Sequence, residues 1–98
     1  MAREVIWSLE ALSDLETIAD YIAKDSPFYA SSFVRELKEI SRSLATLSER
    51  GRIVPEFDQS DIREIFVKKY RLIYQIKISQ IKILTLVHGA RDFSRTLS

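Results

Sequence analysis

The apolar residues of this 98-residue chain change their spacing near the middle of the sequence. Over residues 9–22 and again over residues 30–47 they recur every three or four positions, which is typical of one face of an amphipathic helix. Over residues 70–78 they recur every second position, with Ile73 as the exception, which indicates a strand. The change of period predicts two helices followed by a group of strands, an order typical of α+β proteins.

Short polar residues, proline and glycine mark the expected ends of the helices. Ser8 precedes the first apolar stripe and is expected to cap that helix, because a serine hydroxyl can accept from a free amide of the first turn. Ser26 is the expected cap of the second helix, and Pro27 suits its first position. A link this short predicts that the two helices pack as an antiparallel hairpin. Gly51 is predicted to end the second helix as its C′ residue.

Four runs of β-branched, aromatic and aliphatic residues predict the strands. Residues 50–61 carry turn-forming residues without a period and are predicted as a loop. Ser79-Gln80 is the predicted turn between the last two strands, and Gly89 is expected to adopt a positive φ after the last one. The predicted fold is α+β in the order β-α-α-β-β-β, with the helical hairpin packed on a mostly antiparallel sheet in one domain over residues 1–98. The predicted strands are residues 5–7, 62–67, 70–78 and 81–87.

The composition excludes several classes of protein and site. There is no cysteine, which excludes a disulfide scaffold, a thiolate metal site and a cysteine nucleophile, and fits a reducing compartment. Glu4, Glu10 and Asp14 interrupt the N-terminal segment, so no secretory signal is expected. No uncharged stretch approaches the ~20 apolar residues of a membrane span. We therefore expect a cytoplasmic protein, and the absence of phosphate-loop and zinc spacings leads us to expect no cofactor and no metal.

The formal net charge of +1 conceals an asymmetry between the two halves of the chain. Residues 1–49 hold five Lys and Arg against nine Asp and Glu, a charge of −4. Residues 50–98 hold ten against five, a charge of +5. A uniformly basic nucleic-acid binder is excluded, but a basic surface on the sheet half is compatible with RNA, with an acidic segment of a partner protein or with an acidic protein surface.

Six short motifs carry a resemblance to a known family along nearly the whole chain. They are V-I-W-S-L-E-A-L-S-D-L, Y-I-A-K-D-S-P, G-R-I-V-P-E, I-R-E, Y-R-L-I-Y-Q-I and V-H-G-A-R. In this order and spacing the chain resembles the RelE/ParE superfamily of bacterial type II toxin–antitoxin toxins, known also as plasmid stabilization system toxins. The resemblance implies a small toxin neutralised by a cognate antitoxin, whose C-terminal segment covers the hairpin and sheet as a helix plus extended chain.

The resemblance leaves the molecular target open between two branches. RelE-like members cut messenger RNA in the ribosome, whereas ParE-like members inhibit DNA gyrase without being nucleases. For a nuclease, Arg71 matches the arginine of the RelE motif on the central strand and Arg91 matches the arginine after the last strand. Two arginines could clamp a phosphate, and His88 is the only histidine available as a general acid or base.

Two departures favour the ParE-like branch. The tail, residues 92–98, lacks the tyrosine of RelE members, and Arg63-Glu64-Ile65 replaces their lysine pair, which introduces an acid that repels phosphate. We therefore expect a gyrase inhibitor. An mRNA endonuclease remains the alternative, since other members cut RNA with a histidine and a glutamate. A third possibility is an inactive homologue that only binds the antitoxin and helps to repress the operon.

Each candidate residue also has a structural interpretation. Arg71 could simply pair with Glu64 on the sheet, and His88 could be a hydrogen-bonded residue at the end of a strand. Glu56 is more simply a solvated loop acid than a catalytic base. Arg91 has the best case for function, because a structural reason for an arginine after the last strand is hard to find. The expected target-binding basic face comprises Arg63, Arg71 and Arg91.

Overall fold

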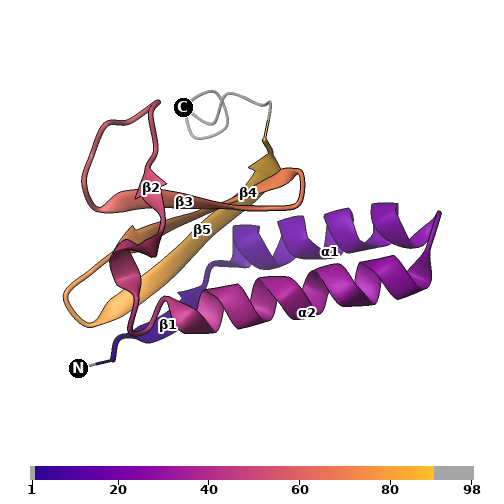
Figure 1. The fold of residues 1–98 in the computed structure, drawn as a ribbon, viewed down its shortest axis with the longest axis horizontal. Coiled ribbons are helices and arrows are strands. Elements are labelled where there is room, and N and C mark those ends of the chain that lie inside the picture. Colours follow the sequence, from indigo (N-terminus) through magenta and orange to yellow (C-terminus); the bar gives the residue numbers. More distant parts are fainter. Residues whose placement is uncertain (1, 90–98) are drawn as a thin grey trace.

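Two helices lie side by side on one face of a five-stranded sheet in the computed structural model, which describes residues 2–89 (Figure 1). The elements are β1 (Glu4–Trp7), α1 (Leu9–Ala23), α2 (Pro27–Ser43), the 3-10 turn η1 (Ser48–Arg50), β2 (Arg52–Ile53), β3 (Ile62–Val67), β4 (Tyr70–Ile76) and β5 (Gln80–His88). The strand order is β1-β5-β4-β3-β2, with β1 parallel to β5 and the other pairs antiparallel. The predicted fold class is therefore confirmed.

The helices begin where the sequence predicts. The Ser8 hydroxyl accepts from the amide of Ala11 at 3.0 Å, and the Ser26 hydroxyl accepts from the amide of Tyr29 at 3.1 Å. Pro27 occupies the first turn of α2, where a backbone N–H would have no acceptor within the helix, so the lack of an N–H in proline costs no hydrogen bond. Both N-caps satisfy an amide that would otherwise have no partner within its helix.

The predicted C-terminal end of α2 is wrong. The helix ends at Ser43 with Leu44 as its cap, and Gly51 follows η1 in an extended conformation with φ −79° and ψ 161°. Gly51 is needed for space, because a Cβ there would lie 2.6 Å from the Glu64 carbonyl oxygen. Gly89 likewise does not have the predicted positive φ; a Cβ on Gly89 would lie 2.7 Å from the Phe66 ring.

The sheet differs from the predicted strands at two places. The predicted loop over residues 50–61 contains the short strand β2, which pairs with β3. β4 ends at Ile76, and the amide of Lys77 donates to the Gln80 carbonyl at 2.8 Å. The connecting residues are therefore Ile78 and Ser79, one position earlier than predicted.

The main core lies between the helices and the sheet, and a smaller one lies on the opposite face. In the smaller core Ile73 packs with Val54 and Phe57, both from the segment of residues 54–61, and with Leu84 of β5. Ile73 breaks the alternation of its strand because β4 is the middle strand and is covered on both faces. The main core comprises Ala11, Phe33, Leu37, Leu44, Val67, Leu72, Tyr74, Ile81, Ile83 and Leu86.

Candidate functional site

Arg71 lies at the centre of a buried ion-pair network on the sheet face opposite the helices. Its side chain is only 4 % exposed. Both terminal nitrogens donate to the Glu56 carboxylate at 2.8 Å, and Nε donates to Glu64. The hydrogen bonds that Arg71 donates to Glu56 are the largest influence that raises the pKa of Arg71, with Glu64 adding to it and burial opposing it. The guanidinium is thus held by protein carboxylates rather than presented to solvent.

Glu64 joins Arg71 to a second arginine. The Glu64 carboxylate is fully buried on β3, and its other oxygen accepts from Nε of Arg52, whose side chain is 63 % exposed. Arg52 also lies over the Phe66 ring, with its guanidinium carbon 5.7 Å from the ring centroid. A buried carboxylate needs such partners, because an unpaired charge in this position would cost several kcal/mol. Pairing of Arg71 with Glu64, one of the two interpretations from sequence, is confirmed.

Glu56 is the residue whose structural role the sequence interpretation missed. It was expected to be a solvated loop acid, but its side chain is only 20 % exposed and it clamps Arg71 with both oxygens. The pair fastens residues 54–61 over the sheet, next to the small core around Ile73. No sequence signal specifies this partner, because Glu56 lies in an irregular segment, 15 positions before Arg71 and separated from it by β3.

Arg63, expected on the target-binding face, is engaged with the backbone. Its side chain is 16 % exposed. Nε donates to the Ser60 carbonyl at 3.0 Å, and Nη1 donates to the Gly51 carbonyl at 3.1 Å. The Glu49 carboxylate lies 3.8 Å from the guanidinium. Arg63 therefore ties the segments before β2 and before β3 to each other.

His88 lies at the end of β5, on the face of the sheet opposite Arg71. It is the cross-strand partner of Tyr70, and the two rings meet edge to face with centroids 5.7 Å apart. Cross-strand partners share a face, whereas consecutive strand residues point to opposite faces. Because Tyr70 and Arg71 are consecutive, the structure does not bring the Arg71 guanidinium and the His88 imidazole together.

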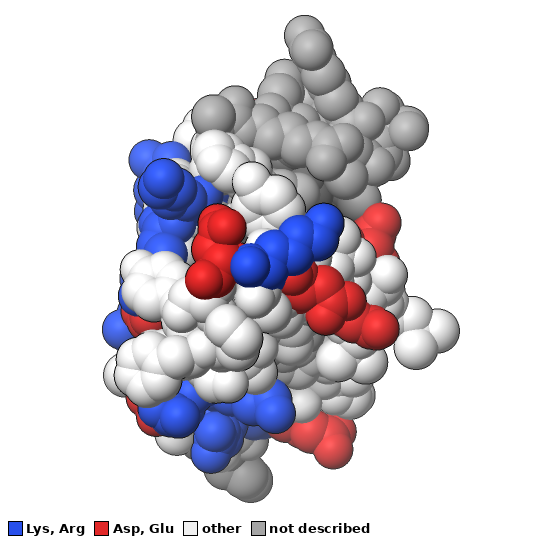
Figure 2. All heavy atoms as spheres, turned by 90° about the vertical axis from the view of Figure 1, so that its right-hand side faces the viewer, with Lys and Arg blue, Asp and Glu red and all other residues white. Residues whose placement is uncertain are grey.

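Arg91, the third candidate, lies outside the described residues. The predicted basic face can therefore be assessed only through its other two members, Arg63 and Arg71, and both are bound to acceptors of the protein. On the face seen in Figure 2, basic and acidic side chains lie in separate groups around a broad uncharged surface.

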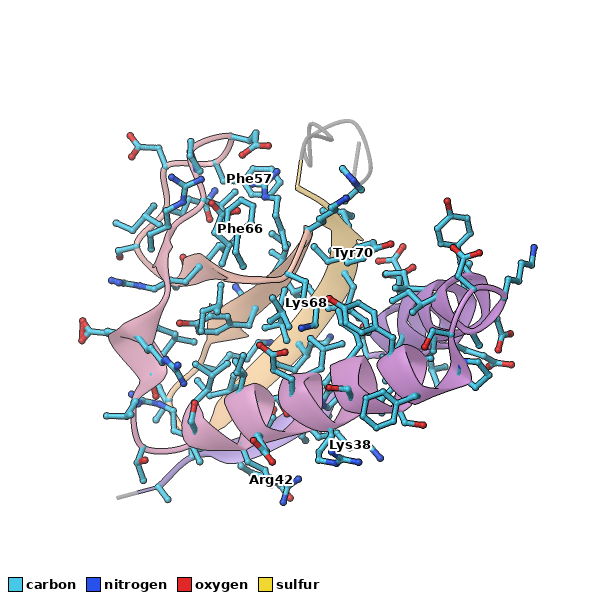
Figure 3. All side chains as sticks on the ribbon, turned by 45° about the vertical axis from the view of Figure 1, so that its right-hand side comes forward. Lys38, Arg42, Phe57, Phe66, Lys68 and Tyr70 are labelled. Carbon is cyan, nitrogen blue, oxygen red and sulfur yellow. The ribbon has the colours of Figure 1, made fainter. Side chains whose placement is uncertain are left out.

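The turn between β3 and β4 carries two features that the sequence did not indicate. Lys68 has a positive φ of 56°, which is uncommon for a residue with a side chain. Its ammonium lies 3.4 Å from the Glu36 carboxylate and 4.9 Å from the centroid of the Tyr29 ring on α2. Figure 3 shows Lys68 and Tyr70 between the sheet and the helices. This turn is thereby fixed to α2.

Among residues 2–89, no three histidine, cysteine, aspartate or glutamate side chains are grouped so that they could hold a metal ion. None of the helices over those residues is both long and apolar enough to cross a membrane.

Three comparisons with solved structures identify the same architecture. The chain superposes on a chain of the chromosomal ParDE TA system from P. aeruginosa with a TM-score of 0.72 and 21 % identity, covering 89 % of this chain and 96 % of that one. The E. coli DinJ-YafQ toxin–antitoxin complex matches with a TM-score of 0.63 and 14 % identity, covering 92 % and 96 %. E. coli toxin RelE in complex with an antitoxin RelBc peptide matches at 0.50 and 17 %, covering 100 % and 97 %. These likenesses show the fold.

Sequence comparisons identify the family. Toxin RelE2 of Caulobacter vibrioides is 35 % identical over 89 residues, which cover 90 % of this chain and 97 % of that protein. The family model described as the ParE toxin of the type II toxin-antitoxin system, parDE, matches residues 5–93. The chain therefore belongs to the ParE toxin family of the RelE/ParE superfamily and is the toxin of a type II toxin–antitoxin system.

Proposed function

We propose that this toxin inhibits DNA gyrase by binding to it, without cutting RNA, and that it acts in the cytoplasm, where its cognate antitoxin neutralises it. One observation carries the choice against a nuclease. Arg71 is held by Glu56 and Glu64 on one face of the sheet, while His88 lies on the other. Arg71 could bind a phosphate only if the phosphate displaced Glu56, and the His88 imidazole would not lie next to a phosphate bound there to act as an acid or base.

The family model supports the same choice, since it is the model of ParE toxins. A glutamate within the I-R-E motif agrees with this branch, because Glu64 is buried beside Arg71 and would repel a substrate phosphate there. An inhibitor that works by binding needs no acid or base, only a complementary surface.

The second candidate function is a ribosome-dependent mRNA endonuclease. It is favoured by the relative that carries the name toxin RelE2. In that case Arg91 and His88 would be the working residues, with Arg71 released from Glu56 on the ribosome. Arg91→Ala and His88→Ala would then each abolish cleavage.

A supercoiling assay with purified gyrase tests the proposal. Wild-type toxin at micromolar concentration is expected to block supercoiling, and the antitoxin is expected to restore it. His88→Ala is expected to retain inhibition, because the imidazole has no chemical role in a binding mechanism. Intact supercoiling, together with cuts within codons of a translated message by primer extension, would refute the gyrase proposal. Intact supercoiling and intact message would identify an inactive homologue that only binds its antitoxin.

A further inference from the structure

A small aromatic pocket lies between the helical hairpin and the turn that joins β3 to β4. It has a volume of about 260 Å³. Sites for small-molecule ligands usually hold roughly 300–1,000 Å³, so this pocket suits one large side chain better than a cofactor. Four of the residues that line it are aromatic: Tyr21 of α1, Tyr29 and Phe33 of α2, and Tyr70 of β4.

Contacts within the protein hold the wall of this aromatic pocket in place. Phe33 is fully buried, and its ring centroid lies 5.4 Å from that of Tyr70. On the other side, the Lys68 ammonium lies 4.9 Å from the centroid of the Tyr29 ring and pairs with Glu36. A pocket that is fixed before binding loses little conformational entropy when a partner docks, so more of the contact energy contributes to affinity.

The mouth of the pocket exposes aromatic rings and a cation that the described part of the protein does not pair. Tyr21 is 66 % exposed and Tyr29 is 49 % exposed. Lys69 is exposed as well, and no carboxylate of residues 2–89 lies within ion-pair distance of its ammonium. Its backbone is fixed, because the Lys69 carbonyl accepts from the amide of Gly89 at 2.7 Å. Tyrosines around a pocket are typical of the residues that dominate the binding energy of protein interfaces.

We propose that this aromatic pocket binds the toxin's target protein by taking up a large apolar side chain that has a carboxylate beside it. The apolar side chain would lie against the aromatic rings, and the carboxylate would pair with Lys69. Asp25 also lines the pocket, from the turn between the helices, so the carboxylate is favoured only on the side formed by Lys69. The inference rests on the proposed function, in which the toxin acts by binding a protein.

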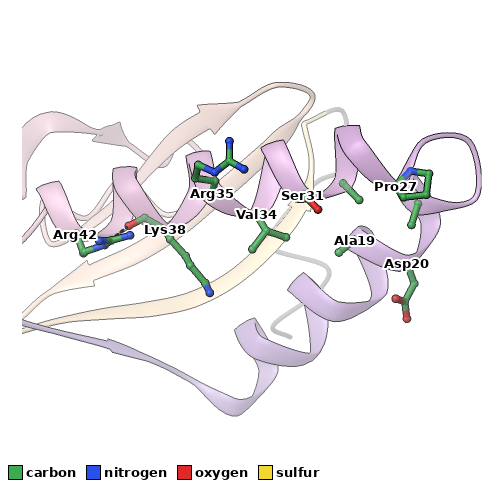
Figure 4. Close-up of a pocket in the computed structure, with 10 residues that line it drawn as sticks. Ala19, Asp20, Pro27, Ser31, Val34, Arg35, Lys38 and Arg42 are labelled. Atoms are coloured by element: carbon green, nitrogen blue, oxygen red, sulfur yellow. Dashed lines mark hydrogen bonds between the residues drawn. The ribbon is translucent and has the colours of Figure 1, made fainter.

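Other surfaces are less suited to this role. On the sheet, Arg63 and Arg71 already bind acceptors of the protein. The groove between the helices is larger, about 570 Å³, but none of the described residues that line it is aromatic, and small side chains such as Ala19 and Val34 border it (Figure 4). An anchor pocket also needs apolar surface around it. Figure 2, viewed from the end where the helices join, shows a broad uncharged surface there.

The experiment compares two matched pairs of substitutions. Tyr21→Ala/Lys69→Glu removes a ring and reverses a charge at the mouth of the pocket. Ile78→Ala/Lys77→Glu removes an exposed apolar side chain and reverses a charge near the turn between β4 and β5, outside the pocket. Each purified toxin is titrated against purified gyrase. The pocket variant is expected to bind and to inhibit at least about 10-fold more weakly, while the control stays within about threefold of wild type.

Three further measurements separate docking from folding and from neutralisation. Both variants change exposed side chains, so their melting temperatures are expected to stay within about 3 °C of wild type. Their affinities for the full-length cognate antitoxin are expected to stay within about threefold. Tyr21→Phe keeps the ring and is expected to retain inhibition, which a role of the hydroxyl would not allow.

Two results would overturn the inference. Gyrase inhibition by the pocket variant that equals wild type would do so and would leave the proposed function intact. Loss of antitoxin affinity with growth inhibition retained would assign the pocket to the antitoxin. If the wild-type toxin does not inhibit gyrase, the proposed target is wrong, and growth inhibition by the toxin expressed alone then decides about the pocket. Growth inhibition lost only in the pocket variant would support target binding there, and growth inhibition kept in it would refute it.

Discussion

Replacing Arg71 by alanine is predicted to destabilise the toxin by about 3 kcal/mol. The substitution removes the donors to Glu64 and to both oxygens of Glu56. Breaking a buried ion pair typically costs about 3–5 kcal/mol, because the remaining charge is left uncompensated. Two features favour the lower end of that range. Arg52 still binds Glu64, and Glu56, already 20 % exposed, can turn into water.

Urea and thermal denaturation followed by circular dichroism measure this loss. For a domain of this size, 1 kcal/mol corresponds to a shift of about 4–8 °C in the melting temperature, so a decrease of about 12–24 °C is expected. Arg71→Met/Glu64→Met is the matched control, because replacing a buried pair by apolar residues of similar volume is often neutral. It is expected to recover most of the loss. A change below about 0.5 kcal/mol in Arg71→Ala would refute the structural role of the network and favour a functional arginine.

Three further predictions concern residues that position the sheet and the helices. Tyr74→Phe removes a hydroxyl that accepts from the amide of Gly51 at 2.9 Å, and should cost about 1–3 kcal/mol in urea unfolding at pH 7. Burial is the main cause that raises the pKa of Tyr74. The neutral hydroxyl therefore stabilises the fold fully below the pKa of an unfolded tyrosine, about 10, and this stabilisation is lost as pH rises through the pKa of the folded protein. Stability curves of wild type and Tyr74→Phe that fall in parallel at alkaline pH would contradict this. Gly51→Ala places a methyl group against the Glu64 carbonyl oxygen and should lower the melting temperature, whereas an unchanged melting temperature would show that the segment adjusts freely. Ser8→Ala removes the cap of the Ala11 amide and should cost about 1 kcal/mol by the same denaturation assay, while Ser8→Thr should retain most of it.

Features set by local chemistry were predictable from the sequence. Ser8 and Ser26 cap the helices as predicted, because capping depends on a few consecutive residues. The runs of β-branched, aromatic and aliphatic residues predicted β3 to β5 to within about two residues. The position of the last turn was wrong by one residue, since Ser79-Gln80 lacks an Asn-Gly type of signal to fix it.

Features set by contacts distant in sequence were not predictable. The conformation of Gly51 depends on how closely the Tyr74 hydroxyl and the β3 backbone approach it. Neither contact can be inferred from the residues that typically mark the end of a helix. The partnership of Glu56 with Arg71 likewise requires the path of residues 54–61 over the sheet. The net charges of the two halves of the chain predict a working surface on the sheet, but they could not show which cations are already paired within the protein.

Whether this ParE-family toxin acts on gyrase, as we propose, or on messenger RNA can be decided by a single experiment in living cells. Toxin expression is induced in growing cells, and plasmid supercoiling and the integrity of a translated message are followed in the same samples. If gyrase is the target, supercoiling is expected to relax within the first minutes while the message stays intact, and co-expressed antitoxin is expected to prevent the change. Message cut within codons while supercoiling is preserved would contradict it.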